Sequence, residues 1–111
     1  MIETLSGDFL LTYKITTMNE QIFVATRQDY YVSRGVCYVL ASDNPVVGVW
    51  QSKRMVDDFF NRRIPHFIER GCTCEHVKEP NSTGVVDRYI IKDADGYVDC
   101  VYIVTLEPLM L

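Results

Sequence analysis

The apolar pattern between Ser52 and Arg70 constrains the fold of this chain more than any other feature. Apolar residues recur there at spacings of three and four, the period of a helix with one buried face. These residues are Met55, Val56, Phe59, Phe60, Ile64, Phe67 and Ile68. Ser52 is a suitable N-cap, and Gly71 suits the left-handed residue that ends a helix. Pro65 lies inside the pattern and predicts a kink or a break into two helices.

Strand-like segments flank this helix on both sides. They are rich in aromatic and β-branched residues and are bounded by turn formers. The expected strands cover residues 9–16, 21–26, 36–41, 46–50, 72–78, 85–92 and 97–106. Asp93-Ala94-Asp95-Gly96 predicts a hairpin between the last two strands, and the final strand is apolar on both faces, as in the centre of a sheet. Residues Arg27 to Arg34 fit a short helix and a strand equally well.

The length and composition of the chain indicate a single domain. Its 111 residues leave no room for a second core, and its 48% hydrophobic residues suffice for one. One principal helix among many strands predicts the α+β class, with residues 1–111 forming a mainly antiparallel sheet of five to seven strands. The amphipathic, Pro-kinked helix should pack on one face of this sheet. Its expected anchors are Phe59, Phe60, Phe67 and Ile68.

The cysteine content and the N-terminal pattern indicate a reducing compartment. Residues Met1 to Thr12 lack a basic start, and polar residues interrupt their apolar run, so no secretory signal is expected. No stretch approaches about 18 consecutive apolar residues, so no membrane span is expected. Four cysteines are few for a small secreted disulfide scaffold. We therefore expect a cytoplasmic protein with free thiols and no membrane contact.

Cys72, Cys74 and His76 occupy alternate positions and would share one face of a strand. Cys37 or Cys100 could add a fourth metal ligand. Alternate side chains on a straight strand start roughly 6 to 7 Å apart, whereas two thiolates on one zinc ion lie about 4 Å apart. The favoured interpretation is therefore buried or half-buried thiols beside a solvent-facing histidine, without metal or cofactor. A zinc site on a bent strand stays the alternative.

The sequence contains no catalytic motif. Its two histidines, His66 and His76, have no spacing that would pair either with a cysteine nucleophile. The six glycines never cluster into a phosphate-binding loop. Asp93 to Gly96 has its glycine too early for an EF-hand loop, and a solvated turn is the better interpretation. We therefore expect a protein that is not an enzyme, with a small enzyme or metal protein of unrecognised site as a further alternative.

Positive charge is concentrated in the predicted helix. Residues 51–71 carry a net charge of +2, although the whole chain carries −4. Arg62, His66 and Arg70 follow one another at four-residue steps and form a polar stripe on a helix. A solvated helix face is the ordinary interpretation, and a contact surface for an acidic protein or for phosphates is the functional one. The predicted partner-binding residues are Arg62, Arg63, His66 and Arg70.

The missing motifs, the small size and the segregated charge favour a non-catalytic protein-binding module, an inhibitor or adaptor whose partner has an acidic surface. In general character the chain resembles the small accessory proteins with which viruses of bacteria bind and inhibit host factors. That resemblance implies an inhibitory role for a viral protein. Nucleic-acid binding through the basic helix face and the tyrosines is the alternative. The apolar segment Leu106 to Leu111 either packs on its own domain or allows self-association.

Overall fold

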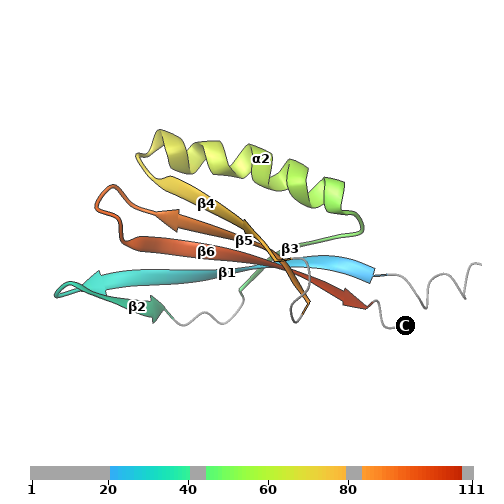
Figure 1. Cartoon of the computed structure of the whole chain (residues 1–111), viewed down its shortest axis with the longest axis horizontal. Helices are drawn as coiled ribbons and strands as arrows, with labels where there is room; N and C mark the ends of the chain where they lie inside the picture. Colours follow the sequence, from blue (N-terminus) through green and yellow to red (C-terminus); the bar gives the residue numbers. More distant parts are fainter. Residues whose placement is uncertain (1–20, 41–44, 80–83, 109–111) are drawn as a thin grey trace, which may run out of the picture.

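The computed structural model describes residues 21–40, 45–79 and 84–108, and Figure 1 shows one helix lying along one side of a sheet. All strand pairings are antiparallel, which confirms the predicted α+β class. The expected strand at 9–16 and the end of the apolar tail, 109–111, lie outside the described residues. The elements are β1 (Gln21–Ser33), β2 (Val36–Leu40), β3 (Val46–Trp50), α2 (Lys53–Glu69), β4 (Thr73–Lys78), β5 (Val85–Lys92) and β6 (Val98–Pro108).

The six-stranded sheet has the order β2-β1-β6-β5-β4, and β3 also pairs with β1. β6 therefore lies at the centre, as its two apolar faces predicted. β1 divides one of its edges between two partners, because residues 29–33 pair with β2 and residues 23–26 pair with β3. Its other edge pairs with β6 along residues 21–29. β5 and β6 form the predicted hairpin.

The ambiguous segment from Arg27 to Arg34 is a strand as far as Ser33. Arg34 and Gly35 then form a two-residue turn, with φ angles of 55° and 76°, between β1 and β2. Positive φ at both turn residues is the type I′ geometry, whose twist matches that of the paired strands. Pairing with β2 on one side and β6 on the other stabilises the strand over the helical alternative.

Both ends of α2 have the caps that the sequence predicted. The Oγ atom of Ser52 accepts a hydrogen bond from the Met55 N–H at 3.3 Å. At the other end Gly71 has a φ of 88°. The N–H groups of Gly71 and the residue after it donate to carbonyls of the last helical turn, each at 3.0 Å. This pair of hydrogen bonds is the Schellman motif, which ends the helix at Gly71.

Pro65 does not divide α2, which continues from Lys53 to Glu69 as one helix (Figure 1). Proline removes the N–H that the Asn61 carbonyl would otherwise accept. Both Pro65 and Asn61 are exposed, so water can bond to that carbonyl. Of the two predicted alternatives, a kink or a break into two helices, the structure excludes the break.

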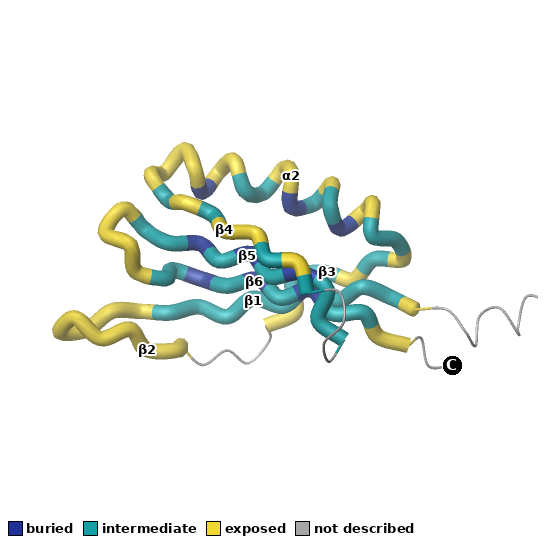
Figure 2. Tube along the Cα trace, viewed as in Figure 1, coloured by how far each residue is buried: buried dark blue, intermediate teal, exposed yellow. Residues whose placement is uncertain are grey.

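The hydrophobic core lies between α2 and the sheet face that it covers, and Figure 2 shows its buried positions on the helix and the central strands. The ring of Phe60 stacks on Tyr89 with their centroids 4.1 Å apart, and it meets Tyr102 edge-on at 5.3 Å. Such aromatic contacts add to the free energy gained by burial. The core residues are Ala25, Val56, Phe60, Phe67, Tyr89, Ile91, Cys100, Tyr102 and Val104.

Two residues of the predicted apolar helix face, Met55 and Ile68, are each 50% exposed. A helix turns about 100° per residue, and the buried arc is centred on Val56, Phe60 and Phe67. Met55 and Ile68 lie about 100° or more to either side of that centre. The prediction that Ile68 anchors the helix to the sheet is therefore wrong.

Candidate partner-binding site

The structure leaves three of the four predicted binding residues on α2 exposed and half-buries the fourth. Arg62, His66 and Arg70 are exposed and follow one another at four-residue steps. Arg63 is half-buried, because its position on the helix falls between Phe60 and Phe67, within the arc that faces the sheet. The exposed basic stripe therefore has three members, and the fourth residue, Arg63, turns towards the core.

Three of the predicted residues line one hollow on the flank of α2. Arg62, Arg63 and His66 surround it together with Phe59, and it has a volume of about 200 Å³. The spacings of three, four and seven residues place these side chains on the same flank of the helix. Two guanidinium groups and an imidazole offer several N–H donors beside an aromatic ring. This set of groups suits a carboxylate or another planar anion.

Aromatic rings hold the guanidinium group of Arg63. Its Cζ atom lies 5.2 Å from the ring centroid of Phe59 and 5.9 Å from that of Tyr102, within cation–π range. The Nε atom of Arg63 is buried and has no hydrogen-bond partner within residues 21–40, 45–79 and 84–108. A buried donor without an acceptor is unfavourable. Arg63 therefore has a buried Nε–H whose hydrogen-bonding capacity no described residue uses.

Arg27 and Arg70 approach rings of the same aromatic cluster. The Arg70 Cζ lies 5.1 Å from the Phe67 ring centroid, and the Arg27 Cζ lies 5.5 Å from that of Tyr102. Arg27 also donates hydrogen bonds to the Asp29 carboxylate at 2.7 Å and to the Tyr102 hydroxyl at 3.0 Å. Burial is the largest single effect on the pKa of Arg27 and lowers it, but the hydrogen bond to Asp29 and the nearby Cys100, Tyr102 and Asp29 groups together raise the pKa above its ordinary value. Arginines from β1 and from the end of α2 therefore contact the rings of Phe67 and Tyr102, and Arg27 is paired with Asp29.

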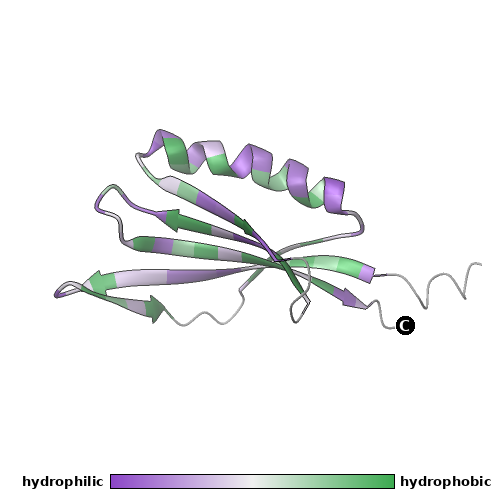
Figure 3. Ribbon diagram, viewed as in Figure 1, coloured by the Kyte–Doolittle hydropathy of each residue, from purple (hydrophilic) through white to green (hydrophobic). Residues whose placement is uncertain are grey.

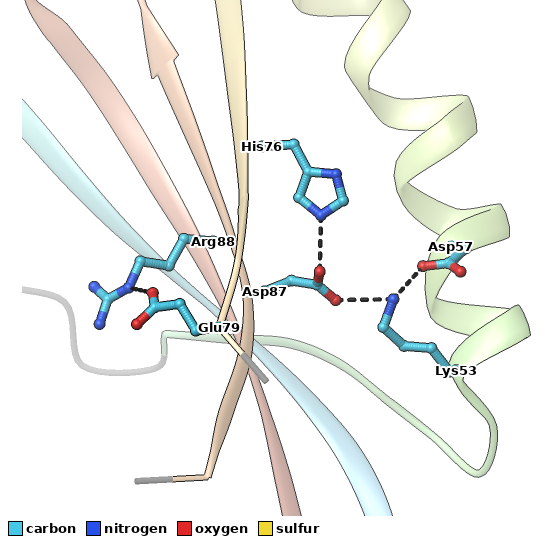
Figure 4. Close-up of polar contacts among 6 residues, drawn as sticks. All are labelled: Lys53, Asp57, His76, Glu79, Asp87 and Arg88. Atoms are coloured by element: carbon cyan, nitrogen blue, oxygen red, sulfur yellow. Dashed lines mark hydrogen bonds and ion pairs between the residues drawn. The ribbon is translucent and has the colours of Figure 1, made fainter. Parts of the chain in front are cut away.

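A second polar cluster, which the sequence did not reveal, links α2 to β4 and β5 (Figure 4). Asp87 is only 1% exposed, and its Oδ1 lies 2.7 Å from the Nε2 of His76. The Nζ of Lys53 lies 2.9 Å from the Asp87 Oδ2 and 2.6 Å from the Asp57 Oδ1. Oδ2 lacks a partner of hydrogen-bond geometry among the described residues, so the ion pair compensates its charge. Burial lowers the pKa of Lys53, but the two carboxylates outweigh this effect and raise it.

The contacts around His76 give this Asp87 cluster a structural role. The imidazole stacks on the Tyr89 ring with centroids 4.2 Å apart. Burial raises the pKa of Tyr89 to about 12, and the Asp87 carboxylate adds to that shift. No hydroxyl or thiol donates to His76 within the described part of the chain, so the histidine has no nucleophile to activate there. The cluster fastens the start of α2 over β4 and β5.

The burial of Asp87 left a weak signal in the sequence. It alternates with apolar residues in β5, where Tyr89 and Ile91 occupy the same face. A carboxylate at such an inward position must be paired, because an isolated buried charge is very unfavourable. Its partner Lys53 is 34 residues away in the chain, so only the fold identifies it.

The Cys72 to His76 segment does not gather a set of metal ligands. Cys74 and His76 share the helix-facing side of β4, but His76 is bound to Asp87. Cys74 is half-buried, and burial raises the pKa of its thiol. Within residues 21–40, 45–79 and 84–108, no group of three His, Cys, Asp or Glu side chains is placed to hold a metal ion. His76, expected to face solvent, keeps 34% of its side chain exposed and packs the rest.

The side chain of Asp93 closes the turn between β5 and β6, which contains Asp93 to Gly96. The Oδ1 of Asp93 accepts hydrogen bonds from the N–H groups of Asp95 and Tyr97, at 2.9 and 3.0 Å. Gly96 has a φ of 88°, a conformation that glycine adopts without strain. These local contacts are typical of a solvated turn.

Comparison with known proteins gives no counterpart, since no family model, no curated protein and no solved structure matches the chain. In the part of the chain that the structure describes, no helix is long and apolar enough to cross a membrane. Function must therefore be inferred from the chemistry of the hollow on α2.

Proposed function

We propose that this protein is a non-catalytic protein-binding module, an inhibitor or adaptor, and that the hollow on α2 receives an acidic side chain of its partner. The observation that supports this best is the meeting of Arg62, Arg63 and His66 around one hollow beside the Phe59 ring. Guanidinium groups bind carboxylates through paired hydrogen bonds, and aromatic rings and arginines are enriched in the centres of protein interfaces.

The exposed stripe extends this basic surface beyond the hollow. Arg62 and Arg70 are eight residues apart, or about 12 Å along a helix axis. A partner with two acidic side chains at that separation can contact both the hollow and Arg70. Complementary charge of this kind speeds association and selects the partner, while the aromatic ring contributes burial.

The test is a double charge reversal, Arg62→Glu with Arg70→Glu, on the full chain. Affinity capture from an extract of the native host with the unaltered protein, followed by mass spectrometry, supplies the partner, which is then purified. Titration calorimetry should show at least a tenfold loss of affinity for the double variant, or about 1.4 kcal/mol, because repulsion replaces attraction. The melting temperature should hardly move, because both side chains are exposed.

The matched control reverses two exposed basic residues away from the hollow, Arg54→Glu with Lys78→Glu. It alters the net charge by the same amount, so a general charge effect would weaken both double variants equally. We expect the control to bind within about twofold of the unaltered protein, which is about 0.4 kcal/mol. Unchanged affinity of the Arg62 and Arg70 variant at physiological salt would show that the stripe is only a solvated face.

Binding of single-stranded nucleic acid is the second candidate function. Tyr31 and Tyr38 favour it, because their rings stack with centroids 5.3 Å apart and both side chains are exposed. Fluorescence polarisation with labelled oligonucleotides, without any other protein, tests this function. Affinity that falls steeply with salt and rises when Asp93 and Asp95 are replaced by lysine would favour nucleic acid over an acidic protein.

A further inference from the structure

β2 is an edge strand whose exposed residues are all uncharged. Among the described residues, no strand pairs with its outer edge. Figure 2 shows β2 and the adjoining end of β1 as exposed, and Figure 3 colours most of β2 as hydrophobic. Val36, Tyr38, Val39 and Leu40 are between 44% and 59% exposed, and Cys37 is exposed as well. An uncharged apolar edge strand is a ready template for pairing with another strand.

The β4 edge of the sheet carries the protection that β2 lacks. β4 has Glu75, His76 and Lys78 among its six residues, and all three are exposed. Charged side chains on an edge strand discourage pairing with another chain, because a paired neighbour would bury them. β3 also pairs on one side only and is uncharged, but only two of its five residues are exposed, whereas all five of β2 are. These contrasts favour β2 as the interaction edge.

The phase of the hydrogen bonds defines which β2 groups face outward. The two-residue turn at Arg34 and Gly35 makes Ser33 and Val36 a hydrogen-bonded pair. Bonded and non-bonded pairs alternate along an antiparallel ladder, so Tyr38 and Leu40 direct their N–H and C=O groups towards β1. Cys37 and Val39 direct theirs to the outer edge. The Leu40 carbonyl agrees with this phase, because it accepts a hydrogen bond from the β1 side chain of Gln28 at 2.7 Å.

We propose that β2 pairs with β2 of a second copy of this chain, antiparallel about a two-fold axis at Tyr38. In this register Cys37 lies opposite Val39 of the second copy, and the outward groups of both residues form four hydrogen bonds across the axis. Val36 faces Leu40, so no apolar residue meets a charge. The two Tyr38 side chains lie side by side and extend the stacked pair of Tyr31 and Tyr38 into a row of four rings.

The strand itself argues for a second copy over an unrelated partner. Antiparallel pairing about Tyr38 makes Val-Cys-Tyr-Val-Leu complementary to itself at every position, as a two-fold interface requires. A five-residue strand pair is smaller than the roughly 1,200 Å² of a standard stable interface, so the dimer should dissociate on dilution. Each copy carries a net charge of −4, so added salt should strengthen the dimer by screening repulsion.

Sedimentation velocity over a concentration series tests the association. We expect a dimer that grows with concentration and with salt in the unaltered full chain. Val39→Pro removes an outward N–H without touching the ladder with β1, so this variant should be monomeric. Val39→Thr keeps that N–H and a similar shape and should still dimerise. A protein that is monomeric throughout, or a Val39→Pro variant that dimerises normally, would contradict the proposal.

Oxidative cross-linking tests the register in a Cys37→Ser background. Tyr38→Cys places two thiols at a non-hydrogen-bonded pair, with Cα atoms about 4.5 Å apart, so a disulfide should join the two copies. Val36→Cys is the control, because the two copies of position 36 would lie about 13 Å apart, beyond disulfide reach. Cross-linking of both variants to the same extent, or of neither, would overturn the proposal. A disulfide in the Tyr38→Cys variant alone would support it.

Discussion

Three alanine substitutions along α2 test how the helix meets the sheet. Phe60 is 1% exposed, and a buried aromatic side chain removes about 150 to 250 Å² from water. Burial of that area contributes roughly 4 to 6 kcal/mol at about 25 cal/mol per Å², and alanine keeps part of it. Phe60→Ala should therefore lower the free energy of unfolding by about 4 kcal/mol, as is usual for a buried phenylalanine. Phe59 is half-buried, and its ring centroid lies 4.9 Å from that of Trp50. Phe59→Ala should therefore lower the free energy of unfolding by about 2 kcal/mol. Ile68 is half exposed, and alanine favours the helix, so Ile68→Ala should cost less than about 1 kcal/mol.

Urea denaturation measures all three free energies, provided that the dependence on urea stays the same among the variants. The expected order of destabilisation is Phe60, then Phe59, then Ile68. An Ile68→Ala variant as unstable as Phe60→Ala would refute the assigned helix face, because it would place the apolar arc about 80° away. A loss under about 1 kcal/mol for Phe59→Ala would show that this ring is exposed instead of half-buried.

Three further predictions concern buried polar groups and thiols. Burial raises the pKa of Cys100 to about 11 from an ordinary 9.0, so the free energy of unfolding should fall as the pH rises from 9 to 11. A Cys100→Ala variant should lose part of that decline in urea titrations at each pH. Lys53→Met should lower the free energy of unfolding by about 2 kcal/mol in the same assay, because it removes the ammonium group that is paired with the buried Asp87 carboxylate. Breaking a fully buried ion pair would cost more, but Lys53 is partly exposed. A chelator should leave the melting temperature unchanged, and stoichiometric zinc lost together with the fold would instead make Cys72 to His76 a metal site.

The sequence predicted those parts of the fold that depend on neighbouring residues. Ser52 and Gly71 cap α2 through contacts within a few residues, so their roles were visible in the pattern. The two apolar faces of β6 likewise predicted its central place. The strand between Arg27 and Ser33 could not be decided, because its stability depends on pairing with β2 and β6, which are distant contacts. The effect of Pro65 depended on its exposure, which the rotation of the helix determines.

The candidate site divides in the same way. The four-residue steps of Arg62 and His66 predicted a shared stripe, and both side chains line the hollow. The half-buried place of Arg63 and its contact with Phe59 required the rotation of α2 on the sheet. Asp87 needed still more, because its two partners, Lys53 and His76, come from different elements. Spacing along one element is therefore predictable here, whereas contacts among several elements are not.

The most direct test of the proposed function is to map the partner contact on the isotope-labelled protein by NMR. Titration with the purified partner should change the amide signals of α2 most, with the largest changes around Phe59, Arg62, Arg63 and His66. The Arg62→Glu and Arg70→Glu double variant should not show those changes under the same conditions. Without partner, the amide signals of its sheet should match those of the unaltered protein. Changes confined to β2 or β4, with the α2 signals unmoved at saturating partner, would contradict binding through the hollow.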